Sequence, residues 1–176
     1  MIKARFLVLL FAVFLFTPSL FAQDNAAGSA AAPGCGAPDT TFEVKTGKSH
    51  PPAQPETGKA LLYFIQDDSD FATRPRPTTR MGIDGKWVGA THSSSYFYFS
   101  VDPGVHHVCA SWQGMEIDQV TAAAHFTAEA RGVYYFEAKN TYSASGSKGI
   151  RLNPLDSDEG QLLVSQFSFS TSHPKK

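Results

Sequence analysis

Residues 95–112 read SYFYFSVDPGVHHVCASW, and this stretch indicates the fold class of the chain. Between residues 95 and 101 the side chains alternate between two faces, which is the period of a β-strand. Asp102-Pro103-Gly104 is a turn sequence. Val105 to Trp112 then alternates again and predicts a second strand.

Similar strand signals recur through the rest of the chain. They comprise an apolar run from Ala60 to Ile65, a hairpin from Arg80 to Ala90 turning at Asp84-Gly85, and runs of about Asp118 to Ala128 and Val133 to Asn140. Strands at this spacing predict an all-β fold, an antiparallel β-sandwich of about seven to eight strands. Near the end, Asp156 with Glu159 has capping-box spacing and predicts a short C-terminal helix.

The first 22 residues have the organisation of a signal peptide. Lys3 and Arg5 precede an unbroken apolar run from Phe6 to Phe16, and cleavage is expected after Ala22. A membrane anchor is the alternative, but this run is shorter than the roughly 20 residues that span a bilayer. The mature chain is therefore expected to be periplasmic or secreted, with no transmembrane helix.

The mature chain divides by composition into three parts. Residues 23–57 are expected to hold a disordered Ala-, Gly- and Ser-rich leader, a short strap strand at Thr40 to Val44, and a proline-rich linker. Residues 58–170 are expected to form one β-sandwich domain, and residues 171–176 a tail.

Cys35 and Cys109 are the two cysteines of the chain. In an exported protein such a pair favours a disulfide, the alternative being two buried thiols too far apart to bond. Alternation places Cys109 on the face of its strand opposite Val108 and Ala110, which are apolar. Cys35 is therefore expected to strap the segment around Phe42 across the outer side of that sheet.

Several segments together resemble a bacterial exported family, domain of unknown function 2846. They are residues 58–63 (GKALLY), 83–89 (IDGKWVG), 95–107 (SYFYFSVDPGVHH) and 132–136 (GVYYF). The middle portion is also similar to PEGA-type repeats, in which a DGK-x-V-G strand precedes a PG-x-H turn. The resemblance covers roughly residues 58–168 and implies a β-sandwich without an assigned activity. The chain lacks the lipidation cysteine of the family's lipoprotein members.

Charge excludes one class of partner. Removal of the signal leaves 13 basic against 16 acidic residues, a net charge of −3. This balance does not favour nucleic acid, which requires a clustered basic surface. Arg74, Arg76 and Arg80 are interpreted as part of a solvated loop.

Metal binding and catalysis find little support in the sequence. His106 and His107 leave opposite faces of one strand, and His107 with Cys109 would supply only half of a closed zinc site. The loop with Asp67, Asp68 and Asp70 lacks the glycine and closing Glu of an EF-hand. No nucleophile elbow is present. We therefore expect no metal, no cofactor and no catalytic residue.

The aromatic side chains supply the candidate ligand-binding residues Trp87, Tyr96 and Tyr98. Strand alternation places some of them opposite the core, where exposed rings can stack on a sugar or grip a peptide. Burial under the N-terminal segment or the terminal helix is the alternative. The sequence thus favours a non-catalytic exported module that binds an envelope protein or a glycan. The alternatives are a small metal-dependent or hydrolytic enzyme using His107 and the 67–70 loop, and a purely structural envelope protein.

Overall fold

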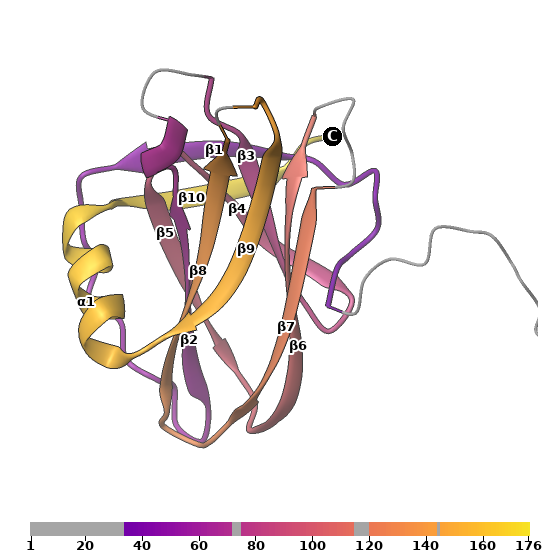
Figure 1. The fold of residues 1–176 in the computed structure, drawn as a ribbon. Coiled ribbons are helices and arrows are strands. Elements are labelled where there is room, and N and C mark those ends of the chain that lie inside the picture. The colour runs from indigo at the N-terminus through magenta and orange to yellow at the C-terminus, as the bar shows by residue number, and fades with distance from the viewer. Residues whose placement is uncertain (1–33, 72–74, 115–119, 144) are drawn as a thin grey trace, which may run out of the picture.

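The computed structural model describes residues 34–71, 75–114, 120–143 and 145–176. The predicted signal peptide and nearly all of the predicted leader lie outside these residues. Two β-sheets pack face to face, with one short helix, α1, on the outside (Figure 1). In the described part of the chain, no helix is long and apolar enough to cross a membrane.

The larger sheet contains six strands and the smaller sheet contains four. The large sheet has the order β1 (Phe42–Gly47), β10 (Ser168–Pro174), β5 (Ser95–Val101), β2 (Ala60–Asp67), β8 (Val133–Tyr142) and β9 (Lys148–Leu155). The small sheet has the order β4 (Lys86–His92), β3 (Thr78–Ile83), β6 (Gly104–Gln113) and β7 (Thr121–Ala128).

The strongest turn signals in the sequence lie where they were expected. Asp84 and Gly85 both have positive φ, 49° and 80°, and join β3 to β4 as the predicted hairpin. The Asp102-Pro103-Gly104 turn instead carries the chain from β5 in the large sheet to β6 in the small one. This crossing places the two strands of the 95–112 stretch on opposite sides of the core.

The core lies between the sheets and is built from alternate residues of their strands. Its fully buried members come from both layers: Ala60, Leu62, Phe64, Met81, Val108, Ala110 and Ala138. Phe97 and Val101 join this core, as the alternation from residue 95 to 101 predicts. At one side the sheets meet directly, since the Ala90 N–H donates to Ser172 Oγ at 3.0 Å.

The predicted sandwich agrees in outline with the structure but differs from it in two details. Ten strands are present among the described residues, because β9 and β10 were not recognised. In β9, Gly149 and Pro154 interrupt the alternation, and β10 is mainly Ser and Thr, so neither has a strong strand signal. The large sheet is also mixed rather than antiparallel, since β2 pairs with β8 and β10 with β5 in parallel.

The predicted tail and strap strand are corrected together. Residues 171–174 belong to β10, where they pair with β1, so the tail forms part of the sandwich. The strap strand, expected across the small sheet, is instead β1 at the edge of the large sheet. Its exposed edge is partly satisfied because the Gln113 side chain exchanges two hydrogen bonds, of 2.9 and 2.7 Å, with the Phe42 backbone.

The predicted C-terminal helix is α1 (Ser157–Gln166). Asp156 caps it, since Asp156 Oδ1 accepts a hydrogen bond from the Glu159 N–H at 2.8 Å. Gly160 lies directly on the Tyr135 ring: a Cβ at this position would meet a ring carbon at 2.2 Å. The helix therefore covers the outer face of the large sheet at very close range.

Candidate functional site

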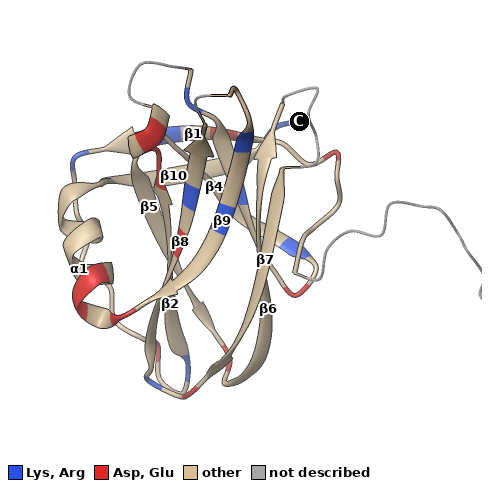
Figure 2. Ribbon diagram, viewed as in Figure 1, with Lys and Arg blue, Asp and Glu red and all other residues tan. Residues whose placement is uncertain are grey.

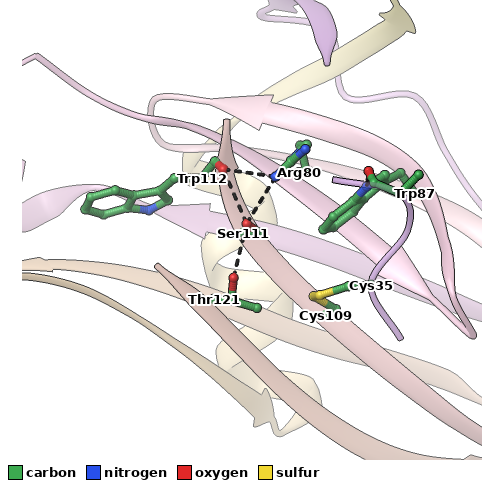
Figure 3. The surroundings of a disulfide bond; sticks show 8 residues. Cys35, Arg80, Trp87, Cys109, Ser111, Trp112 and Thr121 are labelled. Carbon is green, nitrogen blue, oxygen red and sulfur yellow. Dashed lines mark hydrogen bonds between the residues drawn. A yellow bond between two sulfur atoms is a disulfide. The ribbon is translucent and has the colours of Figure 1, made fainter. Parts of the chain in front are cut away.

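The disulfide between Cys35 and Cys109 fastens the N-terminal residues 34–41, here called the strap, to the small sheet (Figure 3). The two Cα atoms lie 5.1 Å apart and both side chains are buried. Cys109 lies on the face opposite the core residues Val108 and Ala110, as strand alternation predicts. Gly34 packs against the backbone of His107, where a Cβ would come within 2.6 Å of the carbonyl oxygen.

Arg80 fixes the remainder of the strap. Its Nη1 donates to the carbonyl oxygens of Pro38 and Thr40 at 2.7 and 2.8 Å. Its Nη2 donates to Ser111 Oγ and to the Trp112 carbonyl, both at 3.3 Å. The interpretation of Arg80 as part of a solvated loop was wrong: the strap encloses its side chain, which is 4% exposed.

Trp87 also lies beneath the strap. Its ring centroid is 4.6 Å from the Arg80 guanidinium, and its Nε1–H donates to the Ala37 carbonyl at 2.7 Å. Gly36 rests on the indole, because a Cβ there would lie 2.5 Å from a ring carbon. Trp87 is thus separated from Tyr96 and Tyr98, which belong to the large sheet, and the three candidate residues do not share one surface.

Four tyrosines gather on the outer face of the large sheet, and we call them the tyrosine face: Tyr63, Tyr96, Tyr98 and Tyr135. Tyr63 on β2 is central, stacking on Tyr135 at 4.9 Å and lying 5.4 Å from Tyr98 between ring centroids. Tyr96 is 1% exposed, whereas Tyr63 and Tyr98 are half-buried. Two of these rings therefore retain a surface that a ligand can touch.

The surroundings hold these rings in place. Leu163, Val164 and Phe167 pack against the cluster from the helical side. On the linker side, His50 Nδ1 lies 3.2 Å from the Tyr96 hydroxyl. Burial, with the neighbouring tyrosines, raises the pKa of Tyr63 to about 12, so its hydroxyl stays protonated in alkaline as well as neutral solution.

The tyrosine face continues along the strands into charged residues. Figure 2 shows acidic residues at the first turn of α1, and β8 carries the oppositely charged Glu137 and Lys139. Burial is the main cause of a raised pKa at Glu137, and the Asp67 charge acts in the same direction. Burial alone would also raise the pKa of Asp67, but hydrogen bonds from Lys139 and Ser69 and the Lys139 charge outweigh it and lower this pKa.

Asp68, from the same acidic loop, points inside the protein. Its two carboxylate oxygens accept from Asn140 Nδ2 at 2.6 Å and Gln66 Nε2 at 2.7 Å. Asn140 in turn accepts from Trp112 Nε1 at 2.7 Å. Burial raises the pKa of Asp68 despite these hydrogen bonds. The arrangement is a buried polar network that ties the loop to both sheets.

The residues considered for a metal-dependent enzyme are not brought together. His107 lies on the small sheet and Asp67 at the end of β2 in the large sheet. Cys109 is in the disulfide and supplies no thiolate to pair with His107. Within the described ranges, no group of three or more His, Cys, Asp or Glu side chains is arranged to hold a metal ion.

Two histidine arrangements were not predicted from the sequence because they depend on strand register. His125 on β7 lies directly opposite His107 on β6. His106 bridges two turns: its Nδ1 is 2.6 Å from Asp84 Oδ2 and its Nε2 is 2.7 Å from the Asp102 carbonyl oxygen. The only signal for either in the sequence is the histidine itself, without the spacing that reveals a partner.

No protein-family model, no curated protein and no solved structure matches this chain. The resemblance to the exported family therefore stays a prediction.

Proposed function

We propose that the mature chain is a non-catalytic, exported β-sandwich module that binds an envelope protein or a glycan through the tyrosine face. The observation that carries the proposal is the half-buried pair Tyr63 and Tyr98, held from behind by the buried rings of Tyr96 and Tyr135. Rings fixed in this way lose little conformational entropy when a ligand packs on them.

The chemistry of the tyrosine face suits both ligands. A tyrosine ring stacks on the apolar face of a sugar or on a peptide side chain, and its hydroxyl supplies a hydrogen bond. The Tyr63 hydroxyl can donate such a hydrogen bond, and its pKa of about 12 keeps it protonated in alkaline solution too. Export is supported by the disulfide and by the pattern of residues 1–22.

An enzymatic alternative draws on one specific cluster. Lys139 Nζ contacts both the Asp67 carboxylate and the Ser69 hydroxyl, which resembles a serine–lysine pair. However, an ammonium group held by a carboxylate has no lone pair with which to accept the serine proton. The Ser69 N–H also donates to Asp67 Oδ1 at 2.7 Å, so these contacts stabilise the turn. We therefore favour binding over hydrolysis.

The test introduces a photo-crosslinking phenylalanine derivative at position 98 and, in parallel, measures binding of envelope glycan fragments by calorimetry. We expect either a discrete crosslinked protein or saturable glycan binding, and Tyr98→Ala should weaken it about tenfold or more, which corresponds to at least 1.4 kcal/mol. Val105→Ala is the matched control, because Val105 is 66% exposed on the small sheet.

Three outcomes count against the proposal. Crosslinks that form equally well from position 105 would place the contact elsewhere. Absence of both crosslink and glycan binding would favour a purely structural envelope protein. Hydrolysis of an ester or peptide substrate that is lost in Ser69→Ala would favour the enzyme.

A further inference from the structure

The outer face of the small sheet presents two histidine side chains side by side. His107 on β6 and His125 on β7 are directly opposed in the antiparallel register. Both residues are exposed, and their ring centroids lie 6.3 Å apart. Directly opposed residues on neighbouring strands are the closest pairs a sheet provides, so both imidazoles can reach one small ligand.

Both rings are free to act as ligands. Among the described residues, neither the His107 nor the His125 imidazole takes part in a hydrogen bond. The contrast is His106, whose two ring nitrogens face Asp84 and the Asp102 carbonyl oxygen. A neutral imidazole with an unoccupied nitrogen is the commonest protein ligand for transition metals.

The backbone beneath His107 is held firmly. Its N–H donates to Asp84 Oδ1 and its carbonyl accepts from the Asp84 N–H, both at 2.9 Å. The disulfide is anchored two residues further along the same strand, at Cys109. A ligand residue on such a fixed strand needs only side-chain rotation to bind, which lowers the entropic cost of forming a site.

We propose that His107 and His125 form a two-histidine site for a late first-row divalent ion, with Cu²⁺ bound more tightly than Ni²⁺ or Zn²⁺. With metal–nitrogen bonds of about 2.0–2.1 Å, the centroids of two imidazoles on one ion lie about 4.5 Å apart in cis and about 6.4 Å apart in trans coordination. The rings lie 6.3 Å apart, so cis binding requires side-chain rotation that brings them about 2 Å closer. The preference for Cu²⁺ follows from the general affinity order of imidazole sites.

Among the described residues, the two histidines are the protein ligands of the proposed site, and no third one is arranged beside them. Asp84, which contacts the His107 backbone, already accepts hydrogen bonds at both carboxylate oxygens, from His106 and from the His107 N–H. The remaining coordination positions are filled by water, so the site is open rather than closed. Two ligands on neighbouring strands lack the sequence spacing that is typical of a closed four-ligand zinc site.

The test is calorimetric titration of the mature, oxidised protein with Cu²⁺ and, separately, with Zn²⁺. We expect one Cu²⁺ per chain, and His125→Asn or His107→Asn should each weaken binding about tenfold or more. His173→Asn is the matched control, since His173 is also exposed but faces Glu43 across β1 and β10. Substoichiometric Cu²⁺ should broaden the amide NMR signals of residues 107 and 125 before all others.

Other results would overturn the proposal. Binding that survives in both His107→Asn and His125→Asn, or that falls equally in His173→Asn, rules out this pair as the site. Metal-free circular dichroism and melting curves of the variants exclude unfolding as the cause, because both side chains are exposed. Tyr98→Ala should bind Cu²⁺ normally. The metal site is therefore tested independently of whether the tyrosine face binds a ligand.

Discussion

The strap covers part of the outer face of the small sheet, and α1 covers part of the outer face of the large sheet (Figures 1 and 3). The strap is joined by a disulfide and by hydrogen bonds from Arg80 and Trp87 to its carbonyl groups. The helix is joined by apolar packing of Leu163, Val164 and Phe167 on the tyrosine face. The comparison shows that irregular backbone needs covalent and polar anchors, whereas an amphipathic helix relies on area buried.

Removal of the disulfide should have the largest effect on stability, and it tests the covalent attachment of the strap. The bond links positions 74 residues apart, for which chain entropy gives about 4 kcal/mol of stabilisation. We expect Cys35→Ser/Cys109→Ser to lower the free energy of unfolding by about this amount in urea titrations. Hydrogen exchange should increase most in the strap, while α1 keeps its protection. Equal loosening of α1 would show that the two coverings are coupled.

Substitution of Arg80 tests the hydrogen bonds that hold the strap while the disulfide stays intact. Arg80→Met leaves the strap carbonyl groups of Pro38 and Thr40 without their donors, and we expect a loss of about 3 kcal/mol. Arg151→Met is the control, because Arg151 is exposed on β9 and should change stability by less than about 0.5 kcal/mol. An Arg80 variant as stable as the control would mean that the disulfide alone holds the strap.

Gly160 tests the apolar covering. A Cβ at this position lies 2.2 Å from the Tyr135 ring, so Gly160→Ala must move the helix or the ring. We expect a net loss of about 2 kcal/mol from this overpacking, although alanine favours helix formation. Near-UV circular dichroism should report the altered tyrosine packing, and Gln161→Ala, at an exposed neighbour, should leave the signal unchanged. A stabilised Gly160→Ala would contradict the close helix–sheet contact.

The sequence predicted those features of the two coverings that depend on local pattern. Alternation along Val105 to Trp112 was enough to place Cys109 opposite the core, and the spacing of Asp156 and Glu159 was enough to predict the helix cap. The Asp84-Gly85 turn was equally local, since its positive φ values require such residues.

What the sequence did not predict depends on contacts between distant segments. In the sequence, Arg80 is indistinguishable from a loop arginine, because the strap that encloses it lies about 40 positions earlier in the chain. The polar strand β10 is specified by pairing with β1 rather than by its own alternation. His125 acquires a partner only through the register of β6 and β7. Pairings of this kind follow from topology, which a local pattern does not encode.

His106 gives the smallest expected effect. It bears on the comparison because its partner Asp84 also accepts from the N–H of His107, against whose backbone Gly34 of the strap packs. Burial by itself would lower the pKa of His106, but the hydrogen bonds and charges of Asp84 and Asp102 outweigh this and raise it. Burial likewise opposes the lowered pKa of Asp84, which results from contacts with His106 and His107.

The signs of these two shifts define a pH window for this contact. The stability contributed by His106 is complete below its unfolded pKa near 6.5 and is lost as pH rises through its folded pKa. The stability contributed by Asp84 is present above about pH 4 and is lost as pH falls through its folded pKa. The contact should therefore stabilise most between about pH 4 and 6.5, by about 1 kcal/mol, since Asp84 is largely exposed. The measurement is the unfolding free energy of the wild type minus that of His106→Asn across pH 3–9. A difference that does not vary with pH would exclude the charged pair, whereas a maximum in this window would confirm that the His106–Asp84 contact stabilises the fold in a pH-dependent way.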